Sequence, residues 1–145
     1  MLDQLTRNGI TRNQLFALAS AGIYFAAGLL GFLVTGFDDF AGDTDEKLII
    51  LGLNPLHNVV HLALGAAWLA AAFSAANARL ANLALGAGLL VAFVLGVAGG
   101  AGFLNIDDAA EPDNYLHLVY GLASVAVGLK ASEDVVHVGR SAVAA

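Results

Sequence analysis

Four long apolar stretches, separated by short segments that hold the charged residues, dominate the pattern of hydrophobic and polar positions. They cover residues 14–37, 55–76, 80–103 and 114–129. A helix needs about 20 apolar residues to cross the ~30 Å hydrocarbon core of a bilayer. The stretches are rich in Ala, Gly and Leu and lack the alternation of apolar and polar positions that is typical of strands. The pattern therefore predicts four transmembrane helices.

The composition points to the same class of protein. Apolar residues make up 59% of the 145 positions, whereas charged residues make up only 12% and lie outside the four stretches. The helices of a soluble domain would carry charges along their polar faces. The absence of cysteine also excludes disulfide bonds, thiolate metal ligands and cysteine nucleophiles.

The basic residues predict the orientation in the membrane. Five of the six precede the first stretch, separate the second from the third, or follow the fourth: Arg7, Arg12, Arg79, Lys130 and Arg140. Because cytoplasmic loops are enriched in Lys and Arg, we expect residues 1–13 to be a cytoplasmic N-terminus and residues 132–145 a cytoplasmic tail. Residues 14–131 then form a multi-pass domain in the inner (plasma) membrane, with the two acidic loops outside.

A repeated motif suggests how the four helices are related. The pattern N-x-x-H-L-x-x-G occurs at residues 58–65 and again at residues 114–121. The tetrapeptide "AGLL" precedes each copy, at residues 27–30 and 87–90. Two copies of one hairpin that start on the same side of the membrane are parallel repeats. The predicted fold is therefore all-α, an integral membrane four-helix bundle built from two parallel-repeated transmembrane hairpins.

Three segments of the sequence together resemble a known family. They are "TGFDD" at residues 35–39, "NPLHNVVHLALGAAWLAA" at residues 54–71 and "DNYLHLVYG" at residues 113–121. The chain resembles the domain-of-unknown-function family 4383, a set of small bacterial membrane proteins with four predicted helices. The resemblance implies the fold and a bacterial membrane, and it leaves the function open.

Helix geometry places the histidines of the motif near the outer surface. Asn54 is a good N-cap and Pro55 suits the first helical position, so the second helix should begin there. His57 and His61 then lie about one and two turns into this helix. In the repeat, His117 occupies the depth of His61.

The repeat also pairs His57 with Asp113, so each copy carries two titratable residues at positions i and i+4, on one helix face. If both faces turn inward, three imidazoles and one carboxylate converge at the outer end of the bundle. Such a cluster suits a transition-metal ion bound by His57, His61, Asp113 and His117. Asn58 and Asn114 would then hold the imidazole tautomers.

Two other interpretations use the same residues. His61 and His117 could be the axial ligands of a b-type haem between the second and fourth helices. Alternatively, the histidines, with Asn54, Asn58 and Asn114, form hydrogen bonds that pin the hairpins together and hold no cofactor. In that case the residues are structural.

Several functions lack the residues they would need. No Lys, Arg, Asp or Glu lies deep in a stretch, so transport of a charged solute is not expected. The sequence has no glycine-rich phosphate loop, no evident base beside Ser20, Ser74 or Ser124, and no basic patch for nucleic acid. We therefore expect a non-enzymatic accessory or assembly subunit of a larger membrane complex, or a homo-oligomer. The alternative is a metal- or haem-binding membrane protein.

Overall fold

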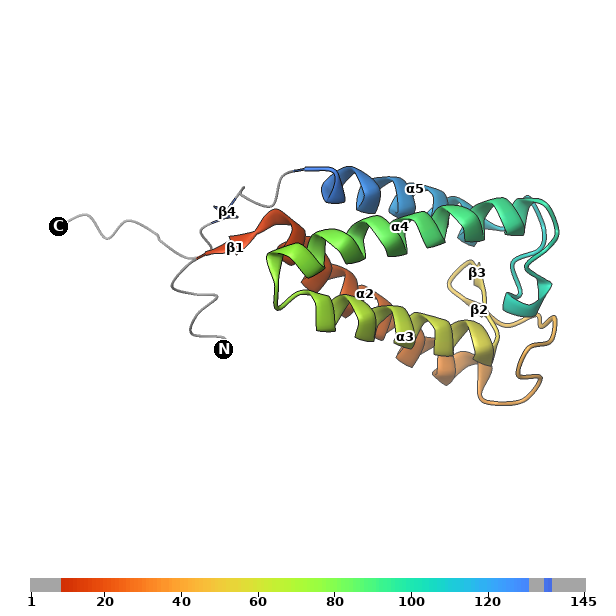
Figure 1. The fold of residues 1–145 in the computed structure, drawn as a ribbon. Coiled ribbons are helices and arrows are strands. Elements are labelled where there is room, and N and C mark those ends of the chain that lie inside the picture. The colour runs from red at the N-terminus through yellow and green to blue at the C-terminus, as the bar shows by residue number, and fades with distance from the viewer. Residues whose placement is uncertain (1–8, 131–134, 137–145) are drawn as a thin grey trace.

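The computed structural model describes residues 9–130 and 135–136, and these residues are mostly helical. The four long helices are α2 (Arg12–Thr35), α3 (Pro55–Ala71), α4 (Ala75–Val97) and α5 (Pro112–Gly128). They run side by side with alternating direction (Figure 1). The start of α2, the turn at residues 72–74 and the end of α5 lie at one end, here called the turn end. The connections at residues 36–54 and 98–111 lie at the other, here called the loop end.

Two of these helices are long and apolar enough to cross a membrane, namely α2 with 24 residues and α4 with 23. Helices α3 and α5 have 17 residues each. At ~1.5 Å per residue each of the shorter helices is about 26 Å long, slightly less than the thickness of a hydrocarbon core. All four helices lie within or across the apolar stretches of the sequence.

Helix α4 is displaced toward the N-terminus relative to the predicted span at residues 80–103. It begins at Ala75 because the side chain of Ser74 accepts a hydrogen bond from the backbone of Asn77. It ends at Val97, two residues before Gly99, whose φ of 76° is left-handed and terminates the helix. Residues 98–103 therefore belong to the loop end.

Side-chain caps fix the start of the first two long helices. The Thr11 hydroxyl accepts from the backbone N–H of Gln14 at 3.2 Å, and the Gln14 side chain accepts from the backbone of Thr11. The carboxamide of Asn54 accepts from the backbone N–H of His57 at 2.9 Å, with Pro55 in the first helical position. The cap predicted for the second helix is therefore present, and it sets the depth of both histidines of α3.

Glycines allow the two helices of each hairpin to pack closely. Gly31 of α2 faces the carboxamide oxygen of Asn58 in α3, and Gly96 of α4 faces the same atom of Asn114 in α5. At either glycine an added Cβ would overlap that oxygen. Each asparagine of the N-x-x-H motif thus lies against a glycine of the preceding helix.

The tetrapeptide "AGLL" does not mark equivalent positions. Gly28 is buried, and a Cβ there would lie 2.8 Å from Leu62. Gly88 is exposed, and a Cβ there would meet nothing within 4 Å. The contacts of Asn58 and Asn114 instead make Gly31 equivalent to Gly96. This spacing differs from the spacing between the two tetrapeptides, so the second tetrapeptide is a chance match in apolar sequence.

The bundle has a polar interior and an apolar outer surface. The fully buried side chains include five asparagines and two serines: Asn13, Asn54, Asn58, Asn82, Asn114, Ser20 and Ser124. Large apolar side chains lie exposed along the outside of the helices, among them Leu33, Leu80, Val94, Val119 and Leu129. So many buried polar and exposed apolar side chains are unusual for a soluble helical domain, although an apolar cluster that includes Tyr24, Trp68 and Leu89 is buried as well.

At the turn end, Asn82 of α4 joins the two hairpins. Its amide donates to the backbone oxygen of Asn13 in α2 at 3.1 Å, and its oxygen accepts from the indole N–H of Trp68 in α3 at 3.0 Å. Trp68 is fully buried. One side chain of the second hairpin therefore bonds to both helices of the first.

At the loop end, two asparagines join the two connections. The amide of Asn54 donates to the backbone oxygens of Gly42 and Phe103, both at 3.0 Å. The side chain of Asn105 accepts a hydrogen bond from the backbone N–H of Thr44 and donates one to the backbone oxygen of Thr44, both at 3.0 Å. The two connections therefore form one cap over the end of the bundle.

Short strands complete the fold. In the first connection β2 (Lys47–Leu48) pairs with β3 (Leu51–Gly52) in an antiparallel ribbon. At the turn end β1 (Ile10–Thr11) pairs antiparallel with β4 (Val135–Val136), so these two residues of the predicted tail contact the segment just before α2. A 3-10 turn, η1 (Gly102–Leu104), lies in the second connection.

The glycine contacts predict a difference between two substitutions in the same helix. Gly96→Ala should lower the free energy of unfolding by about 1–3 kcal/mol, because the new methyl group overlaps Asn114. Gly88→Ala should leave stability unchanged or raise it, because the space around its Cβ is open. Thermal unfolding of both variants in detergent measures the difference, and equal melting temperatures would contradict the packing described.

Candidate metal-binding site

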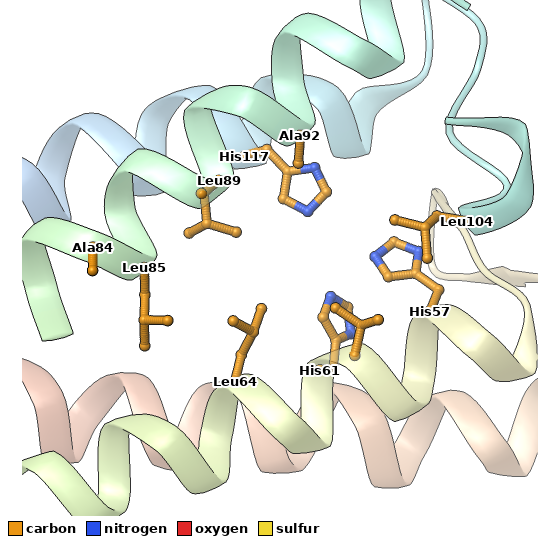
Figure 2. A pocket seen from close by; sticks show the side chains of 11 residues that line it. His57, His61, Leu64, Ala84, Leu85, Leu89, Ala92, Leu104 and His117 are labelled. Carbon is orange, nitrogen blue, oxygen red and sulfur yellow. The ribbon is translucent and has the colours of Figure 1, made fainter. Parts of the chain in front are cut away.

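Three histidines converge where the hairpins meet, near the loop end. His57 and His61 lie one turn apart on α3, and His117 faces them from α5. One ring nitrogen from each histidine can be chosen so that the three atoms lie within 4.8 Å of one another. The ring centroids of His57 and His61 are 4.4 Å apart, and those of His57 and His117 are 5.9 Å apart. Figure 2 shows the three rings pointing into the same space.

Asp113 supplies a carboxylate to this cluster. It lies one turn before His117 on α5, and its Oδ2 is 3.4 Å from Nε2 of His57 and 3.8 Å from Nε2 of His117. The first contact joins the two hairpins and the second lies within one helix. The structure therefore brings together the four residues, three imidazoles and one carboxylate, that the sequence pattern selects.

The four side chains are buried and poorly paired. None exposes more than 7% of its surface. Among the described residues, seven buried side-chain atoms make no hydrogen bond, and four of them belong to this cluster: Nδ1 of His57, His61 and His117, and Oδ2 of Asp113. A buried polar atom without a partner typically costs about 1–3 kcal/mol. Four such atoms lie close together here, a concentration that calls for an explanation.

The asparagines predicted to support the cluster have separate partners. Asn54 caps α3 and bonds to both connections. The amide of Asn58 donates to the hydroxyl of Thr35 at 2.9 Å, and that of Asn114 donates to the backbone oxygen of Asp108 at 2.9 Å. None of these bonds reaches an imidazole side chain. The three asparagines therefore hold the helices and connections around the cluster.

Tyr24, which no sequence motif marks, packs against the histidine cluster. Tyr24 of α2 packs edge-on against His61, with ring centroids 5.3 Å apart. It also packs against Trp68 and Tyr120, with centroid distances of 4.9 and 5.5 Å. The sequence gives no indication of this contact, because a single tyrosine in an apolar helix belongs to no recognisable motif. Its position fixes one side of the His61 ring.

Cavities reach the cluster from two sides. One has a volume of about 220 Å³ and lies between α3 and α4, with all three histidines at its loop end (Figure 2). The other, of about 180 Å³, lies between α2 and α5 and is bordered by His61, Asp113 and His117 together with apolar side chains and Tyr24. The histidines therefore separate two largely apolar cavities at the junction of the hairpins.

Comparison with known proteins identifies the family. The family described as a domain of unknown function, DUF4383, matches residues 14–130, which include all four long helices except the first two residues of α2. No curated protein and no solved structure matches the chain. The matched region includes each of the three histidines and Asp113. The chain belongs to the DUF4383 family of domains of unknown function.

Proposed function

We propose that this protein is an integral membrane protein that binds a transition-metal ion between its two hairpins. The observation that carries the proposal is the convergence of three buried imidazoles, each with an Nδ1 that makes no hydrogen bond in the described structure, beside the carboxylate of Asp113. Neutral imidazole and carboxylate are ligands that suit zinc, copper and iron. An ion among the three imidazoles would be bound by ring nitrogens, with the Asp113 carboxylate beside the rings as a charged neighbour.

The distribution of hydrogen bonds favours binding over a purely structural role for the histidines. Pinning of the hairpins is already performed by Asn82 at the turn end and by Asn54 and Asn105 at the loop end. In contrast, Nδ1 of each clustered histidine makes no hydrogen bond to any described residue. The Nδ1 atoms of the histidines are therefore available to a ligand, while other side chains hold the bundle together.

The geometry favours an ion over haem. A bis-histidine haem needs two imidazoles on opposite faces of a wide planar ring, but here the third imidazole, of His57, lies in the same space. The cavity beside the cluster is about 220 Å³, whereas pockets for small organic ligands typically measure about 300–1,000 Å³. Three converging imidazoles are instead a common ligand set for a single ion.

Asp113 has a separate electrostatic role in this proposal. The cluster lies in the first turns of α3 and α5, and the positive ends of the helix dipoles there oppose a cation. The carboxylate offsets this field and lies close to two of the imidazoles. Carboxylates beside ligating histidines orient the rings and raise their basicity.

We propose binding without catalysis. The hydroxyls of the two buried serines bond to other groups, since Ser20 donates to the backbone oxygen of Phe16 and Ser124 to that of Asn82, both at 2.8 Å. Neither is prepared to act as a nucleophile. The role that we propose is metal handling or metal-dependent recognition.

Membrane insertion is supported by the surface of the bundle. Helices α2 and α4 can each cross a bilayer, and apolar side chains cover the outside of the molecule. The matching contacts of Asn58 with Gly31 and of Asn114 with Gly96 support two parallel-repeated hairpins. We propose that all four helices span the plasma membrane, with the turn end in the cytoplasm and the loop end outside.

Cysteine labelling tests this topology. The chain has no native cysteine, so each single-cysteine variant reports one position. In intact cells, Asp43→Cys and Asp108→Cys at the loop end should react with an impermeant thiol reagent, whereas Ala76→Cys at the turn end should react only after lysis. Labelling of Ala76→Cys alone in intact cells would reverse the orientation, and labelling at both ends would contradict the four-span arrangement.

Zinc titration of the purified protein tests the metal site. The wild type should bind one zinc ion per chain, because three imidazoles and a carboxylate converge. His57→Ala removes a ligand and should weaken binding strongly. Asp113→Asn keeps the size of the side chain but removes its charge, and should weaken binding by about 10–100-fold. The matched control is Asp38→Asn, an exposed carboxylate outside the cluster, which should bind zinc as the wild type does.

The affinities are measured by competition with a chelator, and melting temperatures with and without zinc show that each variant is folded. A wild type that carries no stoichiometric zinc, and whose melting temperature responds neither to zinc nor to copper, would contradict the metal site. Equal zinc affinities of Asp113→Asn and Asp38→Asn would show that Asp113 does not contribute to the metal site.

A further inference from the structure

The metal-binding cluster is closed toward the loop end. Asn54 and Asn105 bond the two connections to each other directly above α3. Leu104 of the second connection covers the cavity beside His57, and Leu53 of the first connection is almost fully buried. A water-soluble ligand arriving from this end would have to separate the two connections.

The cluster is open toward the side of the bundle. The larger cavity extends from the histidines along α3 and α4 to Leu64 and Leu85, near the middle of both helices. Ala84 and Gly88 of α4 line it and are exposed, so the cavity opens laterally between the two helices. Figure 2 shows imidazoles at one end of this cavity and leucine and alanine side chains along the rest.

We propose that this lateral cavity binds the alkyl chain of a membrane amphiphile whose oxygen head group ligates the metal ion. This inference rests on the metal site proposed above. Three histidines leave a coordination position of a tetrahedral ion open, as in sites that bind water or substrate. The part of the cavity beyond the rings is lined by apolar side chains.

The shape and chemistry of the cavity select this class of ligand. A charged or strongly hydrated molecule would lose its water against Leu64, Leu85 and Leu89 without gaining polar partners. An apolar molecule without a donor atom would leave the imidazole end unused. A straight alkyl chain with one oxygen head group satisfies both parts, and the lateral opening faces the region that lipid chains would occupy in the proposed orientation.

A series of n-alkyl hydroxamates provides the probe, because the hydroxamate ligates zinc and the chain length can be varied. For the zinc-loaded wild type, affinity should rise with chain length and level off when the chain fills the cavity. Each buried methylene adds up to about fourfold in affinity. Binding is measured by isothermal titration at one fixed detergent concentration, and the affinity of each probe is corrected for its separately measured partition into the micelles, which also rises with chain length.

A pair of matched substitutions separates the cavity from other effects. Gly88→Leu places a side chain in the cavity, and nothing lies within 4 Å of the position of its Cβ. Gly22→Leu makes the same change on α2, also with nothing within 4 Å, at an exposed position outside both cavities that border the histidines. Ala84→Leu, at the cavity opening, is a second filling variant in case Gly88→Leu does not fold.

The proposal expects Gly88→Leu to retain zinc but to lose the dependence on chain length, while Gly22→Leu behaves as the wild type. A flat response in zinc-loaded wild type would overturn the lateral site and leave the metal site standing. If Gly88→Leu and Ala84→Leu both kept the wild-type dependence of affinity on chain length, the lateral site would also be overturned. A wild type that binds no zinc would overturn the proposed function, and this inference with it.

Discussion

The requirement that buried polar atoms find partners governs this structure. The bundle has an apolar exterior, so side-chain amides, hydroxyls and imidazoles are collected inside it. In such surroundings an unpaired polar atom is costly, and each hydrogen bond has a structural consequence. Asn82 joins the hairpins at the turn end, and Asn54 and Asn105 join the connections at the loop end. Four of the seven described atoms that depart from this rule lie together in the histidine cluster, and this concentration supports the ligand site that we propose there.

Unequal packing explains why the site lies between the hairpins. Within each hairpin a glycine lets an asparagine approach the neighbouring helix, as Gly31 does for Asn58 and Gly96 for Asn114. Between the hairpins, Tyr120 of α5 packs on Tyr24 and Trp68, and cavities of about 220 and 180 Å³ remain on either side of the histidines. Tight hairpins thus hold the histidines in place, while the looser junction leaves the cavities in which we propose that an ion and its partner molecule bind.

Much of the site could be predicted from sequence because it depends on local spacing. The Asn54 cap fixes the depth of His57 and His61, and the repeated motif brings His117 to the same level. The contributions of Tyr24, Asn82 and Asn105 could not be predicted, because they depend on which side chains meet across helices far apart in the sequence. The displacement of α4 had a local cause, the Ser74 cap, but uninterrupted apolar sequence on both sides of that helix concealed its ends.

X-ray absorption at the zinc edge of the zinc-loaded protein tests the central claim most directly, because it counts and identifies the ligand atoms. The account predicts imidazole scattering from three histidines, with nitrogen ligands at about 2.0–2.1 Å and any oxygen ligand at about 2.0–2.2 Å. His61→Ala should reduce the imidazole contribution by one ring. A shell of oxygen atoms alone, without imidazole scattering, would show that zinc binds elsewhere and would contradict a metal site formed by His57, His61 and His117.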